Sequence, residues 1–352
     1  MTIGAAILPN GLPDPSMPMP SEIQVVEAVN QATQYRLRFG LNIEDGDLAI
    51  LNNSLLDPES ILAVVIRGEP IPSILVSGPV VRQDISFAHG GEGSKVDVHG
   101  MDASVAMDRE NKSVVRSNIN DSTAVMEILA GYAIVPDVSV TTTFHTDLKH
   151  PLVQRETDLR FIRRLARRNG FWFWLTEEAP GVTIGHFKLP PTDGSPEQEL
   201  RINISEPNID SMTLHWNSEA PVSASLTQLD LGNLSAIDGS SERSSITGLA
   251  DQHLADIAPS TRQMHLAVPA DDAGDLSSRG NAALMENGWF VRAQINVRQS
   301  RLNGIIRAHT LVNLDGAGTR HSGKYLVSRV VHDINEEDHM MTVDLIRNGW
   351  NG

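Results

Sequence analysis

One segment near the end of the chain resembles a phosphate-binding loop. It reads Gly318-Thr319-Arg320-His321-Ser322-Gly323-Lys324-Tyr325. A phosphate-binding loop needs Ser or Thr directly after the lysine to hold magnesium, and a helix must follow. Here Tyr325 follows the lysine and begins a strand-like apolar pattern. We therefore predict a hairpin turn at this position and no nucleotide site.

Histidines and carboxylates gather at a second place. His332 and His339 flank a stretch that holds Asp333, Glu336, Glu337 and Asp338. A hard-cation site is one reading, and a charged, solvent-facing hairpin tip is the reading we favour. The pairs Glu177/Glu178 and Glu336/Glu337 are adjacent, so on a strand they point to opposite faces and cannot oppose each other across a cleft. With no Gly-x-Ser-x-Gly elbow either, we expect no catalytic residue, no cofactor and no metal ion.

The strongest local concentration of charge is basic. A helix is predicted from about Thr157 to Gly170, with an apolar stripe on one side. Its other face carries Arg160, Arg163, Arg164, Arg167 and Arg168. This face either pairs with nearby acidic residues of the same chain or docks an acidic neighbour, since arginine pairs bidentately with carboxylates. On the docking reading, reversing Arg163 and Arg167 to Glu should leave the monomer folded and block assembly.

The composition sets limits on function. The 352 residues carry a formal charge of −16, 20% charged and 40% hydrophobic residues, and no cysteine. The acidic balance argues against a nucleic-acid binder, and the missing cysteines exclude disulfides and thiolate chemistry. No apolar run reaches the roughly 18 residues of a membrane helix. Since no Lys or Arg precedes Arg36, a secretory signal would lack its basic region, and we expect folding in the cytoplasm of a host cell.

Short strands dominate the expected fold. Residues 1–22 are rich in proline and predict an extended arm, and residues 23–100 predict a first antiparallel barrel, as in the alternation of Gln34 to Asn42. Residues 101–195 predict an α/β insert that holds the arginine helix and another helix capped by Ser122. Strands over 196–235 should enter a second barrel, which 289–352 completes. Residues 236–288 predict a connection or small subdomain with a short helix near Ala282 to Glu286.

An internal repeat links the two barrels. Leu75-Val76-Ser77, Val80 to Ile85 and Val96-Asp97-Val98 recur in order as Leu326-Val327-Ser328, Val330 to Ile334 and Val343-Asp344-Leu345. Valine-rich strands can look alike by chance. The alternative is that one chain holds two related barrels. Three such chains around an axis would present six similar surfaces on a threefold object.

The order of these features resembles the late control protein D family of phage tails, which includes contractile-tail baseplate hubs and the N-terminal part of VgrG. Three places carry the resemblance, which spans about residues 35–349. They are Gly100 to Arg109 with the helix that follows, the segment Gln154 to Phe173, and the ending His321 to His332.

The resemblance implies a mainly β fold with two related antiparallel β-barrels and an α/β insert. It implies a homotrimeric symmetry adaptor, not an enzyme, that joins a hexameric tail tube to a trimeric spike within the virion baseplate. VgrG continues into an oligosaccharide-binding domain and a β-prism, whereas this sequence stops at Gly352, so we expect the spike to be a separate chain. Expected partners are the first tube ring, the spike and other baseplate proteins, with no specific nucleic-acid binding.

Other functions stay open at this stage. The chain could be the hub of a bacterial extracellular contractile injection system. It could also be a tail-associated cell-wall hydrolase or a receptor-binding β-module. A hydrolase needs a convergent catalytic group, and a receptor-binding module would favour exposed aromatic residues at a barrel mouth.

Overall fold

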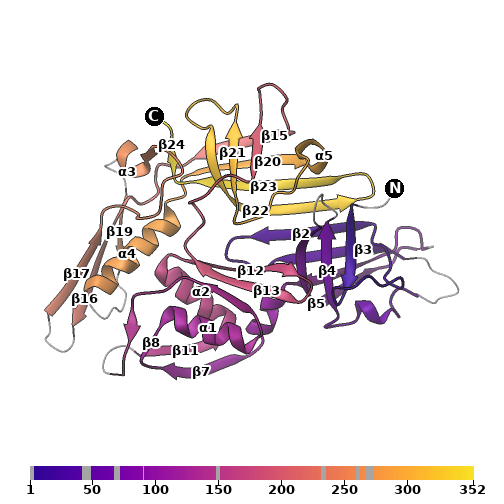
Figure 1. Ribbon diagram of the computed structural model, residues 1–352, viewed down its shortest axis with the longest axis horizontal. Coiled ribbons are helices and arrows are strands. Elements are labelled where there is room, and N and C mark those ends of the chain that lie inside the picture. The colour runs from indigo at the N-terminus through magenta and orange to yellow at the C-terminus, as the bar shows by residue number, and fades with distance from the viewer. Residues whose placement is uncertain are drawn as a thin grey trace.

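The computed structural model describes residues 4–41, 49–66, 72–89, 91–147, 151–230, 235–258, 262–266 and 273–352 (Figure 1). It is mainly β, with two related antiparallel units and an α/β insert, as expected. The first unit (indigo in Figure 1) contains β1 (Ala5–Pro9), β2 (Glu22–Ala28), β3 (Gln34–Gly40), β4 (Ile61–Ile66), β5 (Ser73–Ser86) and β6 (Lys95–Met101), with a short 3-10 turn, η1 (Ser54–Leu56). The second unit contains β14 (Gln198–Arg201), β15 (Ser211–Trp216), β20 (Val291–Arg298), β21 (Leu311–Asp315), β22 (Gly323–Asn335) and β23 (His339–Arg347), with α5 (Gln299–Leu302).

The two units repeat one strand arrangement. In the first unit β4, β5, β6, β3 and β2 are neighbours in that order, and in the second β21, β22, β23, β20 and β15 are neighbours in the same order. The sequence order of these strands also matches, because β2 to β6 correspond one by one to β15, β20, β21, β22 and β23. The additional strand differs, since β1 pairs with β4 antiparallel and β14 pairs with β21 in parallel. The repeat seen in the sequence is therefore a repeat of fold.

The first pieces of the sequence repeat fall on corresponding strands of the two units. Leu75-Val76-Ser77 lies in β5 and Leu326-Val327-Ser328 lies in β22. The register of β5 against β6 shifts between Val80 and Arg82, and that of β22 against β23 shifts between Val327 and Arg329. The third piece of the repeat is not at an equivalent register, because Ile85 pairs with Val96 whereas Ile334 pairs with His339. The strands correspond, but their pairing has shifted.

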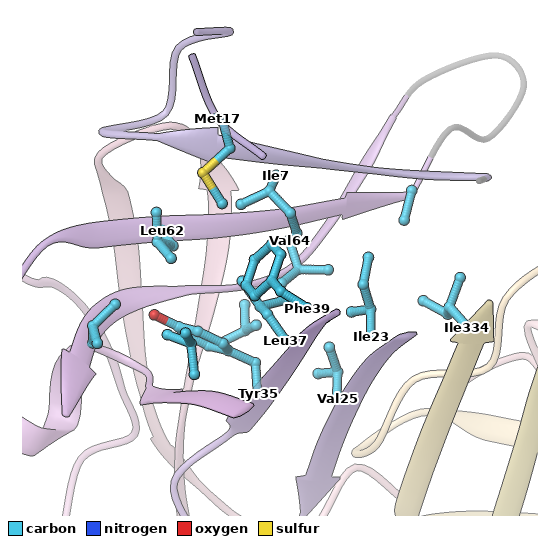
Figure 2. Packing of buried hydrophobic residues seen from close by; sticks show 14 of the residues in the cluster. Ile7, Met17, Ile23, Val25, Tyr35, Leu37, Phe39, Leu62, Val64 and Ile334 are labelled. Carbon is cyan, nitrogen blue, oxygen red and sulfur yellow. The ribbon is translucent and has the colours of Figure 1, made fainter. Parts of the chain in front are cut away.

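Each unit wraps around its own core, and the cores meet at one seam. β2 pairs antiparallel with the end of β22, from Glu22 opposite Asn335 to Ala28 opposite Arg329. Ile334 of β22 packs in the first core beside Ile23 of β2, and both are about 2% exposed or less (Figure 2). A single sheet therefore runs from one unit into the other.

The insert lies below the second unit and to the left of the first unit in Figure 1, and it has its own core. It contains η2 (Ala103–Asp108), β7 (Asn111–Arg116), β8 (Ile119–Asn120), α1 (Asp121–Gly131), β9 (Val135–Val138), β10 (Phe144–His145), β11 (Leu152–Thr157), α2 (Asp158–Asn169), β12 (Trp172–Ala179) and β13 (Val182–Lys188). The predicted boundaries of α2 are confirmed, since the Thr157 hydroxyl caps its start and Gly170 ends it with a left-handed φ of 69°. The predicted cap of α1 is wrong: the Asn120 side chain accepts from the Thr123 N–H, and Ser122 lies inside the helix.

A small subdomain interrupts the second unit between β15 and β20. It contains β16 (Ser223–Asp230), β17 (Ser235–Ser241), β18 (Gln252–His253), α3 (Leu254–Ile257), β19 (Gln263–Leu266) and α4 (Ala273–Asn287). Two expectations are corrected here. β16 pairs with β17 and β19 and so does not enter the second barrel. The short helix is instead fifteen residues long, because buried Leu276 and Leu284 pack it on Leu226 of β16.

The Pro-rich arm is also corrected. Ala5 to Pro9 forms β1 and pairs with β4, and Ala5 and Ile7 are buried in the first core. Met17 is buried there as well (Figure 2). Only part of the described segment is extended, because turns follow β1 at residues 10–12 and 15–17. Its buried apolar residues make it part of the first unit. Small β24 (Gly349–Trp350) pairs with β18 and ties the small subdomain to the end of the chain.

Replacing Gly78 of β5 should destabilise the first unit. A Cβ at this position would lie 1.8 Å from the Met101 carbonyl oxygen, which is backbone and cannot move aside alone. We expect Gly78→Ala to lower the free energy of unfolding by about 2 kcal/mol or more. Gly40→Ala is the matched control, because its Cβ meets nothing within 4 Å. Urea unfolding of both variants checks this, and equal stabilities would contradict it.

Candidate functional site

The arginine face of α2 is engaged mainly within the chain. Arg160 lies 3.3 Å from Asp108, Arg164 contacts Glu156 at 2.6 Å, and Arg167 contacts Glu286 of α4 at 2.8 Å. Arg168 reaches Asp121 at 3.5 Å and Asp275 at 3.6 Å. The structure therefore shows the intramolecular alternative for these four side chains. A docking role of this face stays a prediction and would have to use charges that already have partners.

Arg163 has a different environment from the exposed arginines. It is half-buried, and its charge interacts with those of Asp102 and Asp108. Asp102 is buried and accepts from the Ser104 hydroxyl and from the N–H groups of Ser104 and Thr33. Burial raises the pKa of Asp102, although these hydrogen bonds oppose the rise. The expectation that Arg163 can be reversed without harm to the monomer is corrected, because a glutamate there would face a buried carboxylate.

A cleft lies beside the same helix. It has a volume of about 190 Å³ and is lined by Arg163, Arg167, Trp172, Met285 and Asn30, among others. These residues come from α2, β12, α4 and the turn after β2, so the cleft marks where the insert, the small subdomain and the first unit meet. Two of the predicted arginines therefore line a concave surface.

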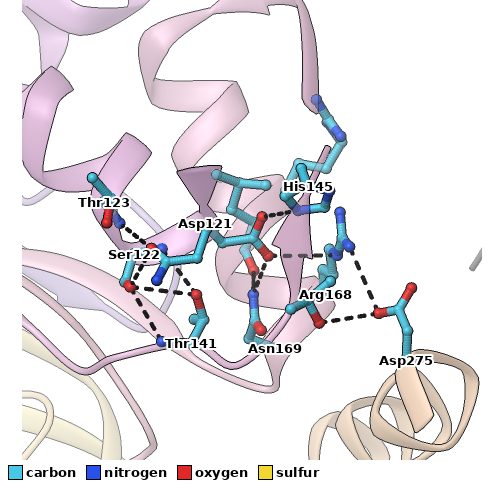
Figure 3. A network of polar contacts seen from close by, with 12 residues as sticks. Asp121, Ser122, Thr123, Thr141, His145, Arg168, Asn169 and Asp275 are labelled. Carbon is cyan, nitrogen blue, oxygen red and sulfur yellow. Dashed lines mark hydrogen bonds and ion pairs between the residues drawn. The ribbon is translucent and has the colours of Figure 1, made fainter. Parts of the chain in front are cut away.

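Behind the arginine face, a buried polar network joins the insert to the small subdomain (Figure 3). Asp121, the first residue of α1, contacts the His145 ring at 2.9 Å and accepts from the Asn169 amide at 2.8 Å. Arg168 stands between Asp121 and Asp275 of α4. Because Asp121, His145 and Asp275 are all under 9% exposed, the network holds the two parts in one geometry.

Charge also crosses the seam between the two units. Glu27 of β2 is buried and contacts Arg307 at 2.5 Å, and its second oxygen accepts from the Ala308 N–H at 2.9 Å. Arg307 also donates to the Ile74 and Leu75 carbonyls of β5. Burial raises the pKa of Glu27, whereas the Arg307 guanidinium and these hydrogen bonds lower it. One ion pair thus fastens the loop before β21 to the first unit.

The histidines considered as metal ligands form a buried pair at this seam. The rings of His332 and His339 contact each other at 3.0 Å, and His339 also contacts Gln299. Burial lowers the pKa of both rings, that of His339 to about 4. In the part of the chain that the structure describes, no three His, Asp or Glu side chains are arranged to hold a metal ion. The expected exposed hairpin tip holds for Glu336 and Glu337, but not for the two histidines, which are buried.

The remaining sequence candidates are placed as follows. Gly318 to Ser322 forms a turn between β21 and β22, as predicted for the segment that resembles a phosphate-binding loop, and the Tyr325 hydroxyl donates to the His321 carbonyl at 2.8 Å. Glu177 is half-buried and accepts from the Thr183 hydroxyl, whereas Glu178 is exposed. Among the described residues, no helix is both long and apolar enough to span a membrane.

Solved structures share this fold. The chain is similar to a tail protein from Neisseria meningitidis MC58, with a TM-score of 0.69, 13% identity, and 99% of this chain and 97% of that one covered. It is also similar to the 43 kDa tail protein of prophage MuSo2 from Shewanella oneidensis, with a TM-score of 0.70, 11% identity and 99% of both chains covered. The E. coli c3393 protein, described as a component of the type VI secretion system, gives a TM-score of 0.58 and 11% identity over 97% of this chain and 76% of its own. The fold is that of phage tail proteins and their secretion-system relatives.

The sequence itself defines the family. Residues 2–336 match the family described as the Alg8 N-terminal domain, and the chain belongs to that family. No curated protein matches the sequence. The expected membership of the late control protein D family is supported at the level of a tail-related fold.

Reversal of the two predicted arginines should have unequal effects. Arg167→Glu changes an exposed pair and should alter the free energy of unfolding by less than about 1 kcal/mol. Arg163→Glu places a carboxylate near buried Asp102 and should cost about 3 kcal/mol or more. Urea unfolding of the two single variants measures this. Similar losses in both would contradict the assigned environments.

Acidification should destabilise the fold through its buried histidines. Burial lowers the pKa of His309 to about 3 and that of His339 to about 4. Above the unfolded pKa of about 6.5 these rings are neutral in both states and the full stability is present. As the pH falls below 6.5, the histidines become protonated in the unfolded chain but stay neutral in the folded chain. The free energy of unfolding therefore falls by about 1.4 kcal/mol per pH unit for each ring, until the pH reaches the pKa of that ring in the folded state. The free energy of unfolding between pH 7.5 and 5 measures the slope.

The control for this prediction is His339→Gln. It removes one titrating ring, so its stability should depend less steeply on pH than that of the unmodified protein. Carboxylates that titrate in the same range contribute equally to both proteins and cancel in the difference. An unchanged slope would show that His339 titrates normally in the fold.

Proposed function

We propose that this chain is the structural hub of a contractile tail or tail-like injection machine, a homotrimer that joins a hexameric tube to a trimeric spike. The observation that carries the proposal is the repeat of five strands, in the same order and with the same neighbours, within one chain. Three copies would present six similar units toward a sixfold tube ring. The tail proteins that share the fold support a place in such an assembly.

The two ends of such an adaptor must differ in symmetry. The insert and the small subdomain occur once per chain, so three copies present each of them only three times. They lie on one side of the paired units in Figure 1. We assign the repeated units to the tube side and the unrepeated parts to the threefold side, where a spike and other baseplate proteins would bind. The mature protein would then be a component of the tail baseplate.

We also propose that the chain is not an enzyme. Its buried charged groups serve junctions between parts: Glu27 with Arg307 joins the units, and Asp121 with Arg168 and Asp275 joins the insert to the small subdomain. This use of charge suits a scaffold. Incubation of the purified protein with peptidoglycan tests the rival reading of a cell-wall hydrolase, which predicts release of soluble fragments.

The likeness to a type VI component favours a second setting. The fold occurs both in tail proteins of phage origin and in a protein of a bacterial secretion system. An extracellular contractile injection system would use the same symmetry adaptor. The identity of the genes beside this one, for sheath, tube, spike and capsid, distinguishes the two settings.

Oligomeric mass tests the adaptor directly. We expect mass photometry or light scattering to give three times the 38.3 kDa mass of one chain, alone or after addition of the spike protein. The trimer should not dissociate on dilution, because permanent interfaces usually bury more than about 2,000 Å². A protein that stays monomeric under both conditions would contradict the proposal.

A further inference from the structure

Through the repeat, two strand edges correspond to the two sides of the internal seam, and among the described residues neither edge has a strand paired to it. At the seam, β2 pairs with the second half of β22. In the repeat, β2 corresponds to β15 and β22 corresponds to β5. Among the described residues, β15 is at the end of the sheet and has β20 as its one paired strand. In the same part of the chain, Arg82 to Ser86 of β5 pair with β6 alone, since β4 pairs with β5 as far as Pro79.

Exposure shows that these two edges are incomplete. The core-facing side chains Ile23 of β2 and Ile334 of β22 are 1% and 2% exposed, because each strand covers the other. On β5, Ile85 faces the same side as buried Val96, its partner on β6, yet it is 43% exposed. On β15, Met212 and Leu214 are only partly buried against the second core, and Trp216 is 51% exposed.

The other end strands of the sheet, β1 and β14, do not share this property. The core-facing Ala5 and Ile7 of β1 are 3% and 8% exposed, and Leu200 of β14 is 0% exposed. The first core is therefore complete at β1 without another strand. Among the described residues, the unfinished edges are those that correspond to the two sides of the internal seam. An open strand edge with exposed apolar residues is a template for pairing with another chain.

We propose that β15 of one copy pairs antiparallel with residues 81–86 of β5 in the next copy, as β2 pairs with β22 within the chain. The partner is a second copy of this chain. The strand needed beside β5 is the equivalent of β2, which is β15, and the strand needed beside β15 is the equivalent of β22, which is β5. The contact is heterologous, because it joins two different surfaces of the chain. Around the threefold axis of the proposed trimer, three such contacts would close a ring in which seams within a chain alternate with seams between chains. This inference rests on the proposed function, in that it assigns the surface through which the copies assemble.

Cysteine cross-linking tests the seam, because the chain has no cysteine of its own. Asp84 points away from the core on β5, and Ser211, Thr213 and His215 do so on β15; all four are exposed. We combine Asp84→Cys with Ser211→Cys, Thr213→Cys or His215→Cys, so that three registers are covered. Mild oxidation should link at least one pair into covalent dimers and trimers on a denaturing gel.

Three controls accompany the cross-links. Gln24→Cys with Asp333→Cys spans the internal seam, where these residues are opposite each other, and should form a disulfide within one chain. Ser113→Cys with Asp84→Cys uses an exposed position of the insert and should give no ladder. Each single variant should stay unlinked, because a heterologous contact does not bring identical positions together.

A charge placed on the edge gives a second, independent measurement. Ile85→Lys should raise the dissociation constant of the oligomer at least tenfold, because the lysine would replace an apolar residue that the next copy covers. Val115→Lys is the matched control, since Val115 is a 67% exposed residue of the insert, and should have no effect. Both sites are already exposed in the single chain, so both variants should fold, which circular dichroism confirms.

The outcomes separate this inference from the proposed function. Covalent ladders together with a weakened Ile85→Lys oligomer support the seam. A stable trimer with no cross-link in any register and no effect of Ile85→Lys would overturn the seam and leave the adaptor in place. A chain that is monomeric both alone and with the spike would overturn both.

Discussion

The arrangement of the whole chain depends on the antiparallel pairing of β2 with β22. This pairing joins two strands that are about 300 residues apart in sequence and so makes one sheet of the two units, and it places Ile334 of the second unit in the first core. The buried carboxylate of Glu27 makes the junction specific, because Arg307 contacts one of its oxygens and the Ala308 N–H donates to the other. Loss of one member of such a pair leaves an uncompensated buried charge, which usually costs about 3–5 kcal/mol. The two units are therefore fixed in orientation as well as in contact.

Features that depend on neighbouring residues in the sequence, such as helix ends and strand alternation, were predicted correctly. The cap and the end of α2 follow from Thr157 and Gly170, and the alternation in β3 follows from a strand with one buried face. The repeat was visible because the central strand of each unit keeps its apolar residues. The predictions were wrong for elements whose structure depends on packing against distant parts of the chain. β1 is a strand because β4 pairs with it, and α4 is long because it covers β16, and neither neighbour is near in sequence.

The candidate site shows the same limit more sharply. Five arginines on one helical face were plain in the sequence, but their partners were not. Arg167 meets Glu286 and Arg168 meets Asp275, more than 100 residues further along the chain. Whether such charges are paired within the chain depends on which helices pack together, and the sequence of one helix does not show this. The buried network around His145 was missed for the same reason, since a lone histidine in a strand carries no signal of its own.

A repeated unit with unequal insertions is what a change of symmetry requires. In a trimer, two identical units per chain would give an approximately sixfold arrangement on every surface, and two unrelated units would give a sixfold arrangement on none. Here the five common strands keep the same neighbours, while the second unit alone carries a subdomain between β15 and β20, where the first unit has only the short connection from β2 to β3. The polar junction Asp121–Arg168–Asp275 joins the two unrepeated parts, the insert and the small subdomain, to each other. In the proposed adaptor rigid attachment would matter, because a flexible linkage could not transmit the orientation of a threefold partner to a sixfold one.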